Sequence, residues 1–409
     1  MVLQALALPM HLNELKKSSL DELNKKAASQ GLTPSDSKDA TQLILEILRA
    51  HTKSGGAVSS AGTLEILGDG FGFLRGSKND FSPSPQDIYV SPSQIRRFHL
   101  NTGDDVKGQV RPPKESERYF ALLRVETING LSTDKATTSQ GFSERTAVHA
   151  AQRIGLGHTS TTSKLFDLLC PLGKGQRALI FAPARTHGDA LLFDLANAAK
   201  HHKKEYDLTC LVVGQRPEFV SEYLAAAPGE IASSSFDEPS QRHTQITDVV
   251  LENAKRAADK GQDVLILVDS LSRLASAASQ ASPGTGIALP GGLSPRGMQA
   301  TRRLFGAGRN LQSAGSITVI ALLRDSGSAI DAHLRQEFSD SANATIQLSS
   351  KASLACCALP LAKDGFYNPD EAKFLEADAL KALATARATL DVATEDEYHE
   401  ALRALEADL

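Results

Sequence analysis

From Lys164 onward the chain alternates short apolar runs with segments of helical spacing, and few architectures satisfy this pattern. The clearest runs are Asp207 to Val213, Val264 to Val268 and Ser316 to Leu322. Because two parallel strands need a long crossover between them, alternation of this kind is typical of a mostly parallel sheet covered by helices. Residues 164–409 are therefore predicted to form an α/β domain.

The first strand-to-helix junction of this domain lacks the residue types that bind phosphate. Residues 182–190 read Ala-Pro-Ala-Arg-Thr-His-Gly-Asp-Ala. A working phosphate-binding loop ends in Gly-Lys-Ser/Thr, so that a lysine holds the phosphates and a hydroxyl holds Mg²⁺. The three corresponding residues here are His187, Gly188 and Asp189. Asp189 suits a helix N-terminus but repels a triphosphate, so the junction predicts an ATPase fold that has stopped binding ATP.

Composition describes an ordinary soluble chain. Its 409 residues, 41% of them hydrophobic, suffice for two or three domains. No apolar stretch approaches the ~20 residues of a membrane span, and Val2 to Met10 lacks the basic flank of a secretory signal. These features predict a cytoplasmic protein without membrane contact. A net charge of −4 gives no general basic field, so any nucleic-acid binding must be local.

The metal-ligating residue types show no metal-site spacing. Four cysteines occur without a C-x-x-C pair, and the eleven histidines form no H-x-x-x-H pair in a plausible site. We predict core or inert thiols and no metal site. The cysteines are Cys170, Cys210, Cys356 and Cys357.

Three further segments precede the α/β domain. Residues 11–52 have helical periodicity, with a Ser19-Leu-Asp-Glu22 helix start and a break at Gly31 to Pro34, and predict a small helical module. Residues 53–62 are rich in Ser, Gly and Ala and predict a linker. Short alternating runs then predict a small barrel over 62–127, and the polar residues 128–163 predict a connector.

Aromatic residues alternate with arginines and carboxylates in the barrel segment. In five-stranded barrels of this type, aromatic faces stack unpaired bases, while polar groups read base edges or hold phosphates. Residues 64–124 hold nine Lys/Arg against eight Asp/Glu, so affinity would depend on stacking more than on charge. Alternating aromatics are also common in cores. However, Phe71 and Phe73 are two residues apart with only Gly72 between them, and so share one face of a strand.

The stretch from Gly62 to Val125 resembles the primary RNA-binding domain of the Rho family of bacterial transcription terminators. The likeness continues in the 11–52 module, in residues 166–177 before the altered loop, and in the later motifs 235–243 and 268–274. It covers about residues 11–350. The resemblance implies an OB-fold, cold-shock-like barrel at 62–127 and a RecA-like ATPase domain at 164–409.

The resemblance also implies a set of RNA-binding residues and their partner. Rho captures single-stranded, cytidine-rich RNA with its first domain, and the matching residues are all kept in this chain. They are Leu67, Phe71, Phe73, Arg75, Asp87, Tyr89, Glu117, Arg118 and Tyr119. Primary RNA binding is therefore expected to survive.

The motor parts are altered wherever the resemblance can be checked. Rho hydrolyses ATP between subunits of a hexameric ring and threads RNA through the pore. Gln215 stands where the family has an acidic general base, and an amide cannot accept the proton. Phe366 stands near the place of the family's arginine finger. Ile287 and Ala329 replace lysines of the two pore loops, which weakens the grip on phosphates.

Two residues of the family's nucleotide site, an aspartate and an arginine, are still present in this chain. Asp269 ends a strand where a Mg²⁺-holding carboxylate would stand, and Arg273 follows one helical turn later. Without a lysine or hydroxyl opposite, Asp269 is expected to make local hydrogen bonds, and neither ATP nor Mg²⁺ is expected as a cofactor. The altered nucleotide-binding set comprises Arg185, Thr186, His187, Gly188, Asp189, Asp269 and Arg273.

These patterns favour a Rho-like, ATPase-deficient RNA-binding regulator of transcription termination. It would act with the transcription machinery either by entering rings of genuine Rho subunits or by competing with them for RNA. One alternative is an active ATP-dependent RNA translocase with an unconventional loop, which would need ATP and Mg²⁺. Another is a scaffold that uses the motor fold only to bind partners.

Overall fold

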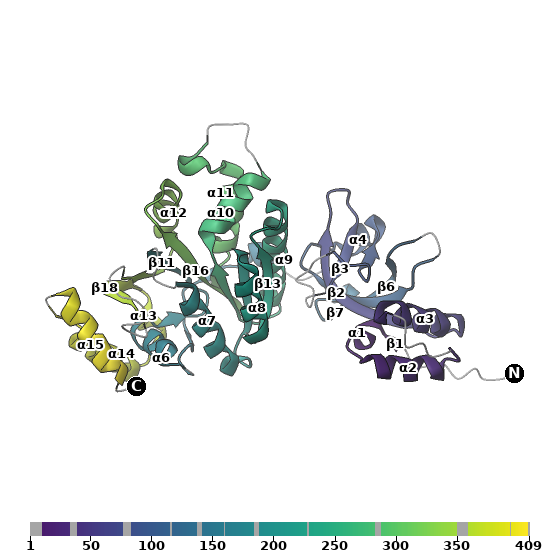
Figure 1. Ribbon diagram of the computed structural model, residues 1–409, viewed down its shortest axis with the longest axis horizontal. Coiled ribbons are helices and arrows are strands. Elements are labelled where there is room, and N and C mark those ends of the chain that lie inside the picture. The colour runs from purple at the N-terminus through teal and green to yellow at the C-terminus, as the bar shows by residue number, and fades with distance from the viewer. Residues whose placement is uncertain are drawn as a thin grey trace. The chain divides into compact units, whose positions relative to one another are not determined.

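The chain folds into two compact units, residues 1–139 and 140–409 (Figure 1). The computed structural model describes residues 10–32, 39–76, 83–114, 117–136, 141–158, 160–183, 188–226, 229–282, 288–349, 359–392 and 394–407. Among these residues, no helix is long and apolar enough to span a membrane.

Three helices open the N-terminal unit. They are α1 (Leu12–Leu15), α2 (Leu20–Ser29) and α3 (Ala40–Lys53). As the sequence predicts, α2 starts at a capping box, in which the Glu22 amide donates to Ser19 Oγ (3.3 Å) and the Ser19 amide donates to the Glu22 carboxylate (3.0 Å). Two of the backbone amides that a helix start leaves unpaired are thereby satisfied.

The five strands that follow form a closed barrel, which confirms the predicted OB-type architecture. The strands are β2 (Val58–Ile66), β3 (Gly72–Arg75), β4 (Ile88–Val90), β5 (Asp105–Arg111) and β6 (Phe120–Ile128). They pair in the order β2-β3-β4-β6-β5, and β5 pairs again with β2 to close the barrel. Only β4 and β6 run parallel to each other within the barrel. Helix α4 (Pro92–Phe98) follows β4.

The predicted linker at 53–62 is wrong for its second half, because β2 begins at Val58. The small side chains there are paired rather than free: Ser60 Oγ donates to Asn13 Oδ1 over 3.1 Å, and Ser59 hydrogen-bonds His11. A Cβ on Gly62 would stand 2.8 Å from the Arg75 carbonyl oxygen. Close packing requires small residues here, and they give the segment the composition of a linker.

The helices and the barrel share one hydrophobic cluster. Leu43 and Ile47 of α3 pack in the same group as Leu64 and Val110 of the barrel. A two-residue strand, β1 (Met10–His11), also pairs in parallel with the start of β2. The N-terminal unit is therefore a single packed body.

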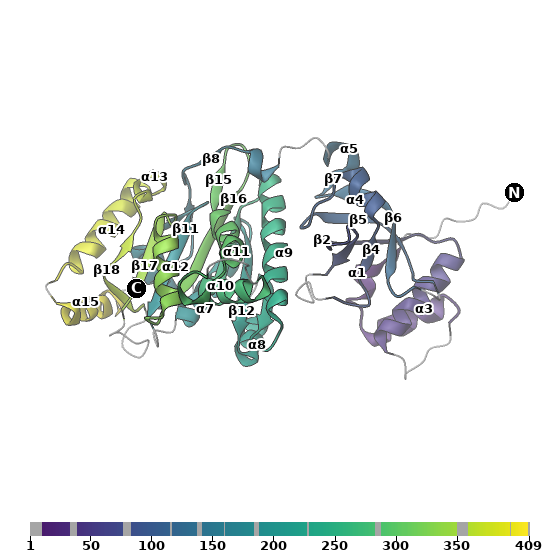
Figure 2. The same cartoon turned by 90° about the horizontal axis from the view of Figure 1, so that it is seen from above.

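The C-terminal unit is built on the predicted parallel sheet (Figure 2). Its strand order is β13-β12-β14-β16-β11-β17-β18, and the last strand is antiparallel to its neighbour. The strands are β11 (Arg177–Pro183), β12 (Asp207–Gln215), β13 (Glu230–Ser235), β14 (Val264–Asp269), β16 (Ser316–Asp325), β17 (Ala344–Leu348) and β18 (Leu361–Tyr367). All three apolar runs that carried the α/β prediction are strands, so that prediction is confirmed.

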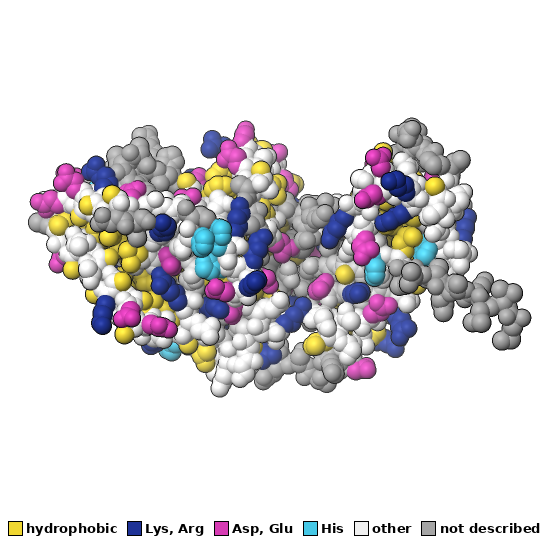
Figure 3. Space-filling model, turned by 90° about the horizontal axis from the view of Figure 1, so that it is seen from below, with side chains coloured by type: hydrophobic (Ala, Val, Ile, Leu, Met, Phe, Trp, Pro, Cys, Tyr) yellow, Lys and Arg dark blue, Asp and Glu magenta, His cyan; other side chains and the backbone are white. Residues whose placement is uncertain are grey.

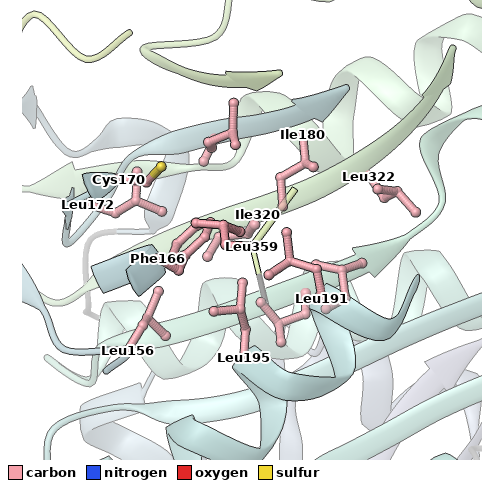
Figure 4. Close-up of a cluster of buried hydrophobic side chains, with 14 of the residues drawn as sticks. Leu156, Phe166, Cys170, Leu172, Ile180, Leu191, Leu195, Ile320, Leu322 and Leu359 are labelled. Carbon is pink, nitrogen blue, oxygen red and sulfur yellow. The ribbon is translucent and has the colours of Figure 1, made fainter. Parts of the chain in front are cut away.

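Helices cover both faces of this sheet. On one face, Leu191 and Leu195 of α7 (Gly188–Ala199) pack against Ile180 and Ile320, as Figure 4 shows. Alternate strand residues such as Ile266 are also buried and lie on the other face, where α9 (Ser240–Asp259) and α10 (Leu271–Ala281) contact the strands. Such burial on both faces explains the continuous apolar runs in the sequence.

The remaining helices of this unit lie before the sheet, between its strands or after its last strand. They are α6 (Thr161–Leu169), α8 (Pro217–Ala226), α11 (Pro295–Gly306), α12 (Ala329–Ser339), α13 (Glu371–Phe374), α14 (Ala377–Thr389) and α15 (Glu395–Ala407). Leu390 and Leu402 of the C-terminal segment belong to the same hydrophobic cluster as Leu191 and Leu195. The last helices therefore close the core of the unit.

The predicted connector at 128–163 is only partly a linker. The division between units falls after Ser139, and β8 (Ala147–Val148) pairs with β15 (Arg309–Leu311) at the sheet. Two further short strand pairs occur. β7 (Leu131–Ser132) pairs with β6, and β9 (Arg153–Ile154) pairs with β10 (Leu172–Gly173). Strands of two residues are too short to show a periodicity in the sequence.

The thiols that the structure describes are buried, as predicted. Cys170 and Cys210 are free and enclosed in the core. Burial raises the pKa of Cys170 well above its usual range and that of Cys210 to about 12, so both stay protonated and unreactive. Cys356 and Cys357 lie outside the described residues.

Candidate nucleic-acid interface and nucleotide site

Four aromatic rings form a cluster on the barrel. The ring of Phe73 lies 5.8 Å from Phe71, 6.0 Å from Tyr89 and 4.8 Å from Tyr119, measured between centroids. The contact of Phe71 with Phe73 agrees with the prediction that they share a face. Phe73 is only 8% exposed and holds the cluster together, whereas the other three rings are half-buried. The cluster therefore serves as core and as a partly open aromatic surface.

Arg75 and Asp87 lie beneath this cluster in a buried ion group. Arg75 Nε donates to Glu65 Oε2 over 2.7 Å, and its Nη1 donates to Asp87. The guanidinium also stands 4.9 Å from the centre of the Phe73 ring. All three charged residues are about 4–5% exposed. In this arrangement they support the aromatic surface from inside, and Glu65 is a member that sequence reasoning missed.

A pocket of about 550 Å³ opens beside the rings. Four of the predicted RNA-binding residues line it, namely Tyr89, Glu117, Arg118 and Tyr119. Leu67, Phe71, Phe73, Arg75 and Asp87 are not among its lining residues. Leu67 lies in the turn before β3, where its amide donates to the Phe71 carbonyl oxygen over 2.8 Å. The set predicted from the sequence thus divides into four residues that line this pocket and five that lie outside its lining.

The same pocket contains residues that sequence reasoning did not select. Leu123 is 57% exposed although it is apolar, and Arg111 lies at the end of β5. Arg111 binds Glu117 through two hydrogen bonds, of which Nη2 to Oε1 measures 2.8 Å. This contact, with the Lys114 amide, lowers the pKa of Glu117 to about 2. The pocket therefore offers aromatic faces, an ionised acceptor and the cation of Arg118.

Charge alone does not mark an interface on the face shown in Figure 3, where basic and acidic side chains are interspersed. Histidines gather on this face of the C-terminal unit, and the rings of His158 and His201 are stacked 3.9 Å apart. Within the described part of the chain, no group of three or more His, Cys, Asp or Glu could hold a metal ion.

At the altered loop, α7 begins directly with Gly188 and Asp189. Arg185, Thr186 and His187 lie outside the described residues. Gly188 is buried, and a Cβ there would stand 2.7 Å from both Ala182 Cβ and Leu322 Cδ1. The place of the family's lysine thus has no room for a side chain without movement of its neighbours.

The retained carboxylate is engaged by two neighbouring side chains. Gln215 Nε2 donates to Asp269 Oδ2 over 2.7 Å, and Arg273 Nη1 donates to Asp269 Oδ1 over 3.1 Å. Asp269 is 1% exposed and Gln215 is 4% exposed. Burial raises the pKa of Asp269, whereas Arg273 and the Gln215 hydrogen bond oppose that rise. Among the described residues of this site, Gln215 supplies an amide next to Asp269, and both oxygens of the Asp269 carboxylate are already engaged by protein donors.

Phe366, which the sequence comparison places near the expected arginine finger, lies on β18 and packs against the large core cluster. The guanidinium of Arg387 lies 5.2 Å from the centre of its ring. Arg387 in turn binds Glu371 through two hydrogen bonds of 2.8 and 3.0 Å. The next arginine in the chain is therefore committed to a structural pair. Ala329 is exposed at the start of α12, and Ile287 lies outside the described residues.

The fold and the two sites define a protein with an OB-fold barrel joined to a nucleotide-binding α/β domain of the ATPase type. Residues 60–134 match the family model described as Rho termination factor, RNA-binding domain. Residues 162–355 match the nucleotide-binding domain of the ATP synthase alpha/beta family.

The chain belongs to the Rho family of transcription termination factors. It is 42% identical over 349 residues to transcription termination factor Rho of Haemophilus influenzae, covering 84% of this chain and 83% of that protein. It is 41% identical over 348 residues to Rho of Escherichia coli K12, with the same coverage. The resemblance noted in the sequence is thus confirmed.

Two solved structures share the fold. An ATPase of a bacterial type III secretion system superposes with a TM-score of 0.52 at 20% identity, covering 64% of this chain and 80% of that chain. The ATP synthase subunit NeqB of Nanoarcheaum equitans gives a TM-score of 0.50 at 18% identity, covering 59% and 64%. The predicted fold class is confirmed, while the roles of the individual site residues stay predictions.

Proposed function

We propose that this chain is an RNA-binding regulator of transcription termination that does not hydrolyse ATP. The observation that carries the proposal is the pairing of Gln215 with Asp269, which puts a neutral amide in the place of the catalytic acid and engages the carboxylate that would hold Mg²⁺. Buried Gly188 and core-packed Phe366 support it, since the lysine and the arginine finger are lost as well. Parts of one catalytic unit do not contribute additively, but the loss of all of them leaves little catalysis.

The RNA side of the proposal rests on the barrel pocket. Tyr89 and Tyr119 offer faces for unpaired bases, and the ionised Glu117 accepts hydrogen bonds. Cytosine presents an amine donor where uracil presents an oxygen, so this combination favours single-stranded, cytidine-rich RNA.

Replacing Tyr119 with alanine is expected to weaken binding of short cytidine-rich RNA about 5- to 150-fold, since stacking on one aromatic ring contributes about 1–3 kcal/mol. Fluorescence anisotropy with labelled RNA measures the effect. The matched control is Tyr367→Ala, which removes a 61% exposed tyrosine from β18 and should leave affinity unchanged. Equal affinities of wild type and Tyr119→Ala would favour the scaffold alternative.

The regulatory side predicts inhibition of an active Rho. We propose that the chain enters Rho rings, because the unit that resembles the motor is retained as a folded body. If one inactive subunit disables a ring of six, a mixture with half inactive subunits keeps only about 2% of its RNA-stimulated ATP hydrolysis, instead of about 50% for independent subunits. Competition for RNA is the other route, and excess RNA relieves it.

The test is ATP hydrolysis by active Rho while this chain is titrated in, at two RNA concentrations. Tyr119→Ala serves as the matched variant: it should still inhibit if rings are mixed and should not if the chain only competes for RNA. Phosphate release by the chain alone would overturn the proposal and restore an active translocase.

A further inference from the structure

A fork of hydrogen bonds joins Arg111 and Glu117 across the wall of the barrel pocket. Arg111 Nη2 donates to Glu117 Oε1 over 2.8 Å, and Nη1 donates to Oε2. The Lys114 amide adds a third donor to Oε2 at 3.1 Å. A planar guanidinium that binds both carboxylate oxygens fixes orientation as well as charge. Both side chains line the pocket together with Tyr89 and Tyr119.

The fork leaves the carboxylate able to bind more. The Glu117 side chain is 35% exposed, and an ionised carboxylate has about four acceptor positions, more than the three that these donors fill. Arg111 and the Lys114 amide hold the pKa of Glu117 at about 2, so it remains an acceptor far below neutral pH. Arg118 is the other charged side chain lining this pocket within the described residues.

We propose that Arg111 is a positioning residue that fixes Glu117 as an acceptor and so makes the pocket prefer cytosine to uracil. The inference rests on the proposed RNA-binding function. A fixed carboxylate accepts from the exocyclic amine of cytosine but faces the O4 acceptor of uracil, and these two bases have nearly the same size. Arg111 acts through Glu117 and is not itself required to touch the RNA.

Loss of the two hydrogen bonds from Arg111 changes both the orientation of the Glu117 side chain and its pKa. In Arg111→Gln the carboxylate is free to rotate, and its pKa returns toward the usual value of about 4.3. Because the acceptor is the ionised form, present above the pKa, the variant loses acceptor strength as pH falls from 7 to 5, whereas the wild type does not.

The experiment measures binding of equal-length oligo(C) and oligo(U) RNAs to the full chain at pH 7 and pH 5. Wild type is expected to prefer oligo(C) by about 5- to 100-fold at both pH values, the discrimination typical of one well-placed base contact. Arg111→Gln should reduce the preference to within about 3-fold at pH 7. Its oligo(C) affinity, divided by that of the wild type, should fall by only about a further 1.2-fold at pH 5, because about one sixth of a carboxyl with a pKa of about 4.3 is protonated there. Protonation of the base cancels in that ratio.

Three controls make the outcome specific. Arg118→Gln removes a cation from the same pocket and should weaken both RNAs alike while keeping the preference. Glu117→Gln should lose the preference, and the double variant with Arg111→Gln should match it, because the two residues act as one unit. Arg111→Lys should restore part of the preference, since it keeps the charge without the fork.

Full preference for oligo(C) in Arg111→Gln at pH 7 would overturn the positioning role. Additive losses in the double variant would also overturn it. Absence of RNA binding by the wild type would instead contradict the proposed function itself, so the two failures are distinguishable. Unfolding curves of each variant accompany the binding data, and Arg111→Lys carries the test if Arg111→Gln fails to fold.

Discussion

Replacing Arg75 with methionine is expected to lower the free energy of unfolding of the N-terminal unit by about 3–5 kcal/mol. The change removes the cation shared by two buried carboxylates, Glu65 at 5% and Asp87 at 4% exposure, while the apolar part of the side chain is kept. A buried charge that loses its partner keeps its desolvation cost. Hydrogen exchange resolved by peptide measures the change separately for each unit of the chain.

The matched control is Arg118→Met, which makes the same chemical change at an exposed arginine. It should alter stability by less than about 0.5 kcal/mol and should weaken RNA binding. The two arginines came from the same family pattern, yet the structure gives them different surroundings. Normal stability together with lost RNA binding in Arg75→Met would show that Arg75 contacts RNA directly and would contradict its supporting role.

Restoring the family's acid by Gln215→Glu is expected to destabilise the C-terminal unit by about 2–4 kcal/mol at pH 7, through a lost hydrogen bond and a carboxyl whose pKa rises by a unit or more. The new carboxyl would replace an amide that donates to buried Asp269 over 2.7 Å. Two carboxylates at this distance cannot both ionise readily, so the pKa of the new group rises above its unfolded value of about 4.3.

The sign of the pH dependence follows from that shift. A group whose folded pKa is raised contributes stability below its unfolded pKa and loses it as pH rises through the folded pKa. Gln215→Glu should therefore differ little from wild type near pH 4 and differ most at pH 7 and above. Urea unfolding followed by circular dichroism at several pH values measures this, since the chain has no tryptophan.

Gln347→Glu provides the matched control for this change. Gln347 Oε1 accepts from Arg335 Nη2 over 2.6 Å, and Arg335 also binds Asp325, so a carboxylate at 347 would share this cation. The variant also loses the hydrogen bond from Gln347 Nε2 to the Leu348 carbonyl oxygen (3.2 Å). It should change the free energy of unfolding by less than about 1.5 kcal/mol at pH 7, the contribution of one hydrogen bond. Suppose instead that Gln215→Glu is as stable as this control and that its free energy of unfolding does not change with pH. The second carboxylate would then be stabilised by another group or by water, which would contradict the closed arrangement that the hydrogen bonds indicate.

Sequence patterns predict the α/β unit well because strands buried on both faces leave long apolar runs such as Val264 to Val268. The start of α2 is predicted by the capping residues themselves. The changes in the motor site are also visible in the sequence, since phosphate binding needs particular residue types. What replaces the lost chemistry is not visible, because Gln215 and Asp269 are 54 residues apart and meet only across adjacent strands.

The linker prediction at 53–62 was partly wrong because serines that are buried and hydrogen-bonded look the same in a sequence as serines exposed to solvent. Ser59 and Ser60 are buried and hydrogen-bonded to His11 and Asn13. These partners lie almost fifty residues earlier in the chain, so the sequence pattern around the serines does not indicate them. The Arg111–Glu117 fork is close in sequence but depends on how the segment between β5 and β6 returns to the barrel. No periodicity identifies such contacts. Spacing predicts which residues share a strand face, whereas hydrogen-bond partners follow from the fold.

The pairing of Met10 with Val58 determines how this chain can be shortened for use as an RNA reagent. A fragment that began at the first barrel strand would lose β1, the partners of Ser59 and Ser60, and the α3 leucines and isoleucines that share the barrel's core. It would expose an unpaired strand edge beside an apolar surface, a combination that promotes aggregation. A soluble fragment that keeps the barrel intact must therefore begin at or before Met10.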